Sequence, residues 1–152
     1  MLLEPKLMAR QRGVTLLELM IVVVIVSILA AVAYPSYMQY VVSTKRTAAT
    51  ATLMQIAERQ QQFFMDNKSY TNDLTSLGYA ANPLSINDSR NTVAAGDADS
   101  VYTITLSNIT ATTYTATAAP LHGQLSRDMD CGSLTLNQAS VQGNSAGGDG
   151  CW

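Results

Sequence analysis

The side chains of this sequence that could do chemistry are few and widely spaced. His122 is the single histidine in 152 residues, and its Pro-Leu-His-Gly-Gln surroundings predict an exposed turn rather than a general base. No serine lies in the pattern of a nucleophile elbow or an oxyanion-hole loop. We therefore expect a protein that is not an enzyme, with no catalytic residues and no cofactor.

Two pairs of carboxylates stand at i, i+2 spacing, Asp97 with Asp99 and Asp128 with Asp130. Calcium sites use such oxygens, but neither pair has the third acid and the glycine spacing of an EF-hand loop. We expect both pairs to be acidic side chains exposed to solvent in loops, so the sequence predicts no metal site.

Glu18 is a carboxylate at the start of a strongly apolar run, LLELMIVVVIVSILAAVAYPSY, and the next charged residue is Lys45. A helix over the uncharged stretch would be about 39 Å long, enough to cross the hydrocarbon core of a bilayer. An unpaired carboxylate in lipid costs several kcal/mol, so we expect Glu18 to have a cationic partner. A solvated charge at the membrane interface is the alternative.

Cys131 and Cys151 are the two cysteines, and both follow the apolar run. Cysteines on one side of a single membrane segment favour a disulfide outside the cytoplasm. Closing this loop would contribute about 3 kcal/mol in the chain-entropy model. Two reduced, buried thiols are the alternative, and a zinc site is disfavoured because the chain has one histidine.

The charge balance argues against a general nucleic-acid binder. The formal net charge is −2, and the N-terminal stretch holds Lys6, Arg10 and Arg12 against Glu4, so the remainder is acidic. Proteins that bind phosphates as their main role are usually basic. Beyond the long helix, the cations available to hold DNA are Lys68, Arg90 and Arg127.

The basic N-terminal stretch before the apolar run is typical of a leader whose positive charge stays in the cytoplasm. Two cleavage positions are open. One is the A-x-A pattern Ala31–Ala33 after the run, and the other is Gly13 before it. The start is also open, because Met8 would leave the short leader MARQRG.

The apolar run continues into an amphipathic segment, so we expect one helix over residues 14–66 with a kink at Pro35. Ala49, Leu53, Ile56 and Phe63 follow the 3.6-residue period of one helix face, and Gln60 interrupts it. This stripe would pack on a sheet.

Residues 67–100 are expected to be irregular, apart from a helical turn in TNDLTSLG with Thr71 or Asn72 as the cap and Gly78 as the terminator. Alternating segments then predict strands in VYTITLS, TTYTATAA and CGSLTLN, the first two joined by a hairpin. The glycine-rich tail that ends in Trp152 predicts no regular structure, and the tryptophan is expected to pack against the head.

A short basic leader ending in Gly13, followed by V-T-L-L-E-L and a long apolar helix with Pro35, resembles the N-terminus of the type IV pilin family. Val14 departs from the phenylalanine that is commonest there. The segments SYTNDLTSLG, YTATAAP and DCGSLTLNQ, with the final CW, are similar to minor pilins of the PilE and ComP types. The resemblance therefore covers nearly the whole chain.

The resemblance implies that prepilin peptidase cuts between Gly13 and Val14 and methylates the new amine of Val14. It implies that Glu18 pairs with the N-terminal amine of a neighbouring subunit in a helical filament, which would supply the counter-charge. Expected partners are other pilins, the peptidase and the inner-membrane assembly machinery. The precursor is expected in the inner membrane with its head in the periplasm, and the product in an extracellular pilus.

The fold class expected is α+β, the type IV pilin fold, with a long kinked helix on a small antiparallel sheet and a disulfide-bonded C-terminal loop. The expected parts are a cleaved leader (1–13), a transmembrane and filament-core helix (14–38), and a head (39–152). The head would comprise a helix half, a loop (67–100), and a region of sheet and disulfide (101–152). The function expected is that of a minor pilin in pilus assembly, twitching motility and adhesion. The alternatives are a DNA-receptor pilin for transformation and a pseudopilin of type II secretion.

Overall fold

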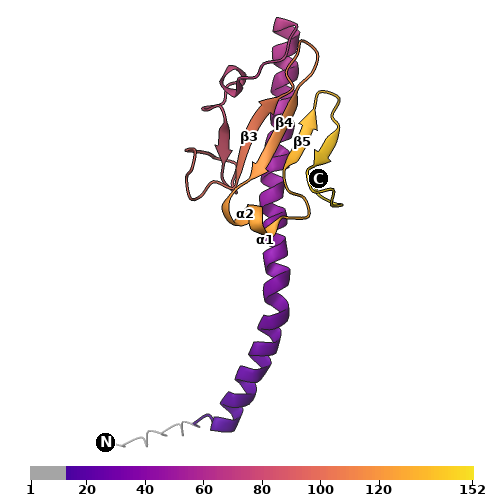
Figure 1. Cartoon of the computed structure of the whole chain (residues 1–152). Helices are drawn as coiled ribbons and strands as arrows, with labels where there is room; N and C mark the ends of the chain where they lie inside the picture. The colour runs from indigo at the N-terminus through magenta and orange to yellow at the C-terminus, as the bar shows by residue number, and fades with distance from the viewer. Residues whose placement is uncertain (1–12) are drawn as a thin grey trace, which may run out of the picture. The chain divides into compact units, whose positions relative to one another are not determined.

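The computed structural model describes residues 13–152, so residues 1–12 of the expected leader, with its two candidate start residues, lie outside the described part. The long helix α1 runs from Leu16 to Asn67 (Figure 1), which confirms the expected helix to within two residues. Pro35 lies inside α1, and the helix continues on both sides of it. The kink expected at Pro35 therefore stays a prediction.

The chain divides into two compact units, one ending at Met38 and the other comprising Gln39–Trp152. We call residues 13–38 the N-terminal segment and Gln39–Trp152 the head. The expected division into leader, filament-core helix and head stays a prediction.

The head contains one antiparallel sheet of six strands in the order β2-β1-β3-β4-β5-β6 (Figure 1). Its centre is the hairpin of β3 and β4, paired over six residues from Tyr102 opposite Pro120 to Ser107 opposite Thr115. The antiparallel sheet and this hairpin confirm the predicted fold class. The strands are β1 (Leu84–Ile86), β2 (Thr92–Val93), β3 (Tyr102–Ser107), β4 (Thr115–Pro120), β5 (Leu134–Asn137) and β6 (Gln142–Asn144).

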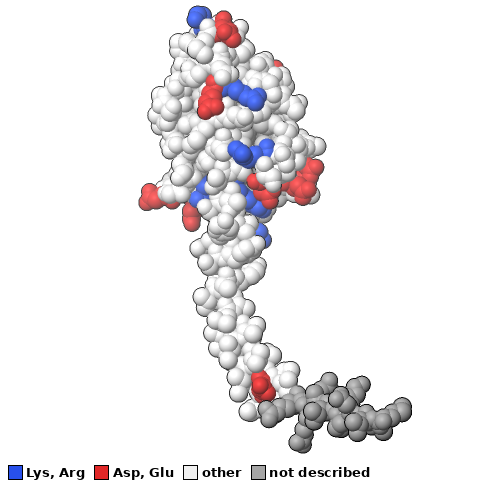
Figure 2. Space-filling view, turned by 180° about the vertical axis from the view of Figure 1, so that it is seen from behind, with Lys and Arg blue, Asp and Glu red and all other residues white. Residues whose placement is uncertain are grey.

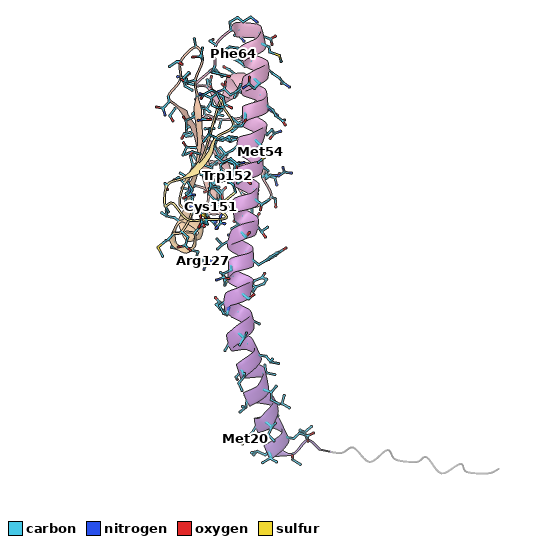
Figure 3. The ribbon with its side chains drawn as sticks, turned by 90° about the vertical axis from the view of Figure 1, so that its right-hand side faces the viewer. Met20, Met54, Phe64, Arg127, Cys151 and Trp152 are labelled. Atoms are coloured by element: carbon cyan, nitrogen blue, oxygen red, sulfur yellow. A yellow bond between two sulfur atoms is a disulfide. The ribbon has the colours of Figure 1, made fainter. Side chains whose placement is uncertain are left out.

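The core of the head lies between one face of the sheet and the head half of α1 (Figure 3). Alternation along β3 buries Tyr102 and Ile104, and the same period along β4 buries the small side chains of Ala116 and Ala118. The helix contributes the predicted stripe of Ala49, Leu53 and Ile56, all fully buried. Burying one such leucine or isoleucine contributes about 1.5–3 kcal/mol, so this interface is what holds the helix on the sheet.

Gln60 belongs to the buried stripe, so the expectation that it interrupts the helix face is wrong. Its side chain is fully buried, and its amide donates to the carbonyl of Thr71 at 2.7 Å while its carbonyl accepts from the Thr71 N–H at 3.1 Å. A buried amide is tolerated when its hydrogen bonds are made. Gln60 therefore fixes the chain as it leaves the helix.

Three segments are more regular than expected. Strands β1 and β2 form a hairpin inside residues 67–100, and β6 lies in the glycine-rich tail. The short helix α2 (His122–Arg127) replaces the expected simple turn. Each of these elements is only two to six residues long, too short to show a period in the sequence, and the strands form because they pair with β1, β3 or β5 in the sheet.

The predicted helical turn is a 3₁₀ helix over Leu74–Leu77. Its cap is Asp73, whose carboxylate accepts from the Thr75 N–H at 2.9 Å, so the expected caps Thr71 and Asn72 are wrong. Gly78 ends the turn with φ of 82°, as predicted, because this left-handed conformation favours glycine.

The C-terminal region is closed by the disulfide between Cys131 and Cys151, which confirms the predicted pair. Trp152 follows it and is partly buried, with its indole N–H donating to the carbonyl of Gly143 at 2.9 Å. Because Gly143 belongs to β6, the disulfide and the tryptophan together hold the tail against the sheet.

Candidate assembly segment and head surface

Thr15 and Glu18 define the N-terminal end of α1. The Thr15 hydroxyl accepts a hydrogen bond from the Glu18 N–H at 3.2 Å, and the Thr15 carbonyl accepts from the Leu19 N–H. Thr-x-x-Glu is the spacing of a capping box, in which the first side chain satisfies a free N–H of the first turn. A carboxylate in this turn also interacts favourably with the positive end of the helix dipole. Glu18 thus stabilises the start of the helix, independently of any cationic partner.

Beyond Glu18 the N-terminal segment presents apolar side chains on every side (Figure 3). Between Leu19 and Ala33 the segment has one polar residue, Ser27. The Ser27 hydroxyl donates to the Val23 carbonyl at 2.7 Å. A hydroxyl satisfied within its own helix is compatible with hydrocarbon. In residues 13–152, α1 is the one helix long and apolar enough to cross a membrane.

The peptide bond between Gly13 and Val14 precedes the helix. Gly13 is exposed, with no atom within 4 Å of where a Cβ would stand, and Val14 is 71% exposed. This geometry leaves the bond accessible to a peptidase. The other cleavage position, Ala31–Ala33, lies within the continuous helix α1.

The interior of the head holds an ion pair that joins α1 to the start of the disulfide loop. The Arg46 guanidinium donates to both carboxylate oxygens of Asp128, which also accept from the Tyr102 hydroxyl at 3.2 Å and the Gln124 amide at 3.0 Å. Asp128 is 2% exposed, so the expectation of a solvated loop charge is wrong for this residue. We call Arg46, Tyr102, Gln124 and Asp128 the buried clasp.

Burial and hydrogen bonding shift the pKa of two groups in the clasp, Arg46 and Tyr102. The hydrogen bond to Asp128 raises the pKa of Arg46 against the desolvation that would lower it. Burial raises the pKa of Tyr102 well above its usual value, so the phenol stays neutral and donates to the carboxylate. Arg46 also donates to the Gly150 carbonyl at 3.3 Å, which links the clasp to the residue before Cys151.

Asp97, Asp99 and His122 lie in one hydrogen-bonded group. Asp97 accepts from the Asp99 N–H at 2.9 Å, an arrangement of a local turn. The His122 ring lies 3.2 Å from the Ser100 hydroxyl and 3.1 Å from the Asp97 carbonyl. Among residues 13–152, no group of three or more His, Cys, Asp or Glu side chains is placed to hold a metal.

The three candidate DNA-binding cations are not brought to one place. Arg127 ends α2 next to Asp128, and therefore lies near Arg46 of α1. Lys68 follows the end of α1, about 33 Å further along the helix from Arg46 at about 1.5 Å per residue. Its amine donates to the Met65 carbonyl.

Arg90 and a cation outside the candidate set, Lys45, border adjoining grooves. Arg90 lines one of about 560 Å³ with Asp88, and Lys45 lines one of about 400 Å³ with Asp88, Asp99 and His122. Lys45 lies on the long helix, and no local sequence pattern shows which loops surround it. Figure 2 shows basic and acidic side chains interspersed over one face of the head.

The long helix, the antiparallel sheet and the disulfide-bonded C-terminal loop, with an apolar N-terminal segment, define the class of type IV pilins. Residues 8–34 match the model of the prokaryotic N-terminal methylation motif. Residues 35–135 match the family described as "Type IV minor pilin ComP, DNA uptake sequence receptor". The chain belongs to this family of type IV minor pilins.

Among solved structures, the chain is similar to a type IV pilin from Shewanella oneidensis at 15% identity. The match covers 73% of this chain and 97% of that chain, with a TM-score of 0.48. A comparison with curated proteins gives no match.

The predicted family, fold class and minor-pilin function are thus confirmed, and the location follows from them. The precursor resides in the inner membrane through its apolar helix, and the product is part of an extracellular pilus.

Proposed function

We propose that prepilin peptidase cuts this chain between Gly13 and Val14 and methylates the amine of Val14. The mature chain is then built into the pilus as a minor, structural subunit with no enzymatic activity. The observation that carries the proposal is the N-terminal segment, which has Glu18 in its first helical turn and no other charge up to Lys45.

Glu18 pairs, in this proposal, with the N-terminal amine of a neighbouring pilin. The apolar surface of the segment is covered by lipid in the precursor and by neighbouring helices in the filament, so a carboxylate within that packing needs a counter-charge. The assembly machinery and other pilins are therefore its partners, and the filament serves twitching motility and adhesion.

The test is quantitative mass spectrometry of filaments sheared from cells that express Glu18→Gln, which keeps the side-chain shape and removes the charge. We expect normal amounts of variant in the membrane and a strong loss from filaments. Glu58→Gln, which neutralises an exposed acid of the same helix, is the matched control and should be incorporated normally. Normal incorporation of Glu18→Gln would refute the pairing.

The same spectra test processing. Filaments should contain an N-methylated peptide that begins at Val14, in small amount beside a more abundant pilin. Gly13→Val should leave a longer precursor in the membrane. A mature-sized product from that variant would show that the cut lies elsewhere.

Duplex DNA binding is a second candidate, because the family's description names a DNA uptake sequence receptor. Lys45, Arg90 and Arg127 would hold phosphates at one end of the head, and the affinity would fall steeply with salt. Asp88 and Asp99 line the same groove as Lys45, and their negative charges weaken the positive potential that would attract phosphates. Substituting each cation by Gln should weaken binding, with Lys68→Gln as the distant control. A head that does not retain duplex DNA at low salt would exclude this candidate.

A further inference from the structure

Two tyrosines stand at the periplasmic end of the apolar segment. Tyr34 and Tyr37 are three residues apart in α1, and they are 67% and 64% exposed. Within residues 13–152 neither hydroxyl has a hydrogen-bond partner. Residues three apart in a helix are neighbours on its surface, so the two rings form one amphipathic patch.

The phenol ring has a chemistry that suits one particular level of a membrane. Tyrosine is enriched at the boundary between hydrocarbon and headgroups, where its ring contacts acyl chains and its hydroxyl bonds to polar groups. The chain before Tyr34 is apolar back to Leu19 apart from the self-bonded Ser27, and the precursor resides in the inner membrane. The patch is thus continuous with the surface that lipid already covers.

The distance from this patch to Glu18 matches the thickness of a bilayer. At about 1.5 Å per residue, Tyr34 lies about 24 Å and Tyr37 about 29 Å along the helix from Glu18. The hydrocarbon core is about 30 Å thick. When the tyrosines are at one headgroup level, Glu18 is therefore at the opposite one, where water and headgroups solvate its charge.

We propose that Tyr34 and Tyr37 bind the headgroup level of the phospholipid bilayer and set the depth of the precursor, which keeps Glu18 at the cytoplasmic interface. At that depth the carboxylate stays solvated while the subunit is in the membrane. This inference rests on the membrane location of the precursor and not on the pairing of Glu18 in the filament, so the two can fail separately.

The experiment measures depth in the full-length chain, reconstituted in vesicles of phosphatidylethanolamine and phosphatidylglycerol. A nitroxide is attached at Val24→Cys, an exposed position of the segment, while the native cysteines stay in their disulfide. Its depth is read by electron paramagnetic resonance, from the relative accessibility to oxygen and to a polar nickel chelate.

Substituting both tyrosines by Ala lengthens the apolar segment, so the helix can slide toward the cytoplasmic side. We expect the nitroxide to move by half a turn to one turn, roughly 2.7–5.4 Å. Substituting both by Trp, the other residue of membrane interfaces, should leave the depth unchanged. Tyr40→Ala is the control for position, because Tyr40 lies about 4.5 Å beyond Tyr37 and about 9 Å beyond Tyr34 along the helix.

An unchanged depth in the double Ala variant would overturn the proposal. If that variant kept its depth but failed to enter filaments, the tyrosines would contact a neighbouring pilin instead of lipid. An equal shift in Tyr40→Ala would place the interface at a different level. A shift confined to the double Ala variant, with rescue by Trp, is the supporting outcome.

Discussion

The buried clasp allows a sharp prediction for Asp128→Asn. The carboxylate accepts two hydrogen bonds from Arg46, one from Tyr102 and one from Gln124, and the exposed fractions of the paired side chains are 18% for Arg46 and 1% for Asp128. The amide leaves the guanidinium without a counter-charge and turns N–H donors toward it. Breaking a buried ion pair from one side costs about 3–5 kcal/mol.

We expect the lower end of that range, about 3 kcal/mol, because Arg46 keeps some contact with water. For a head of this size the loss corresponds to a fall in Tm of roughly 10–15 °C. The assay is urea unfolding of the head from Gln39, followed by far-UV circular dichroism and by fluorescence of Trp152, the single tryptophan. Asp130→Asn, an exposed acid two residues on, is the control and should change stability by less than about 0.5 kcal/mol.

A double-mutant cycle separates the pair from its surroundings. Arg46→Met combined with Asp128→Leu removes both charges, and the Tyr102 hydroxyl keeps its bond from the Gln124 amide at 3.0 Å. The double variant should therefore lose less stability than the two single variants together, by about 0.5–3 kcal/mol. A cost below about 1 kcal/mol for Asp128→Asn, or additive effects in the cycle, would refute the assignment of the clasp as a coupled buried pair.

Three further predictions concern the same head. Gln60→Leu should lower the unfolding free energy by about 1–3 kcal/mol, because it leaves the partly buried backbone N–H and C=O of Thr71 without their partner. Gln62→Leu, at an exposed position, should have little effect. Burial raises the pKa of Tyr114 to about 12, so its contribution to stability should be constant below pH 10 and fall by up to about 3 kcal/mol as the pH rises to 12. Tyr114→Phe should reduce the loss of stability at high pH without abolishing it, because burial also raises the pKa of Tyr79 and Tyr102. Replacing Cys131 and Cys151 by Ser should cost about 3 kcal/mol in urea unfolding, and an unchanged midpoint would contradict the stabilising role of the loop.

The sequence allowed the elements with strong local signals to be predicted. The apolar run, the 3.6-residue stripe and the alternating strands predicted α1, β3, β4 and β5 because their periods repeat over several residues. The strand β2 has two residues, too few to show the alternation of buried and exposed side chains that identifies a strand. It exists because β1 pairs with it on one side and with β3 on the other.

The candidate site divides in the same way. Glu18 and the N-terminal pattern stand out from the sequence because a charge beside a long apolar run is conspicuous and the helix that contains it is local. The partner of Asp128 lies 82 residues earlier in the chain, so its burial was not predictable. Lys45 likewise meets Asp88 and His122 only through the packing of α1 against distant loops.

By itself, then, the sequence determined that a charged residue starts an uncharged helix long enough to span a bilayer, and that the two cysteines follow it. Hydrophobicity and helix length are properties of consecutive residues, so no tertiary contact was needed. The tertiary structure alone decided that Asp128 and Gln60 are buried and that Lys68 lies apart from Arg127. A polar side chain is buried when partners brought from elsewhere satisfy it, and folding decides which partners arrive.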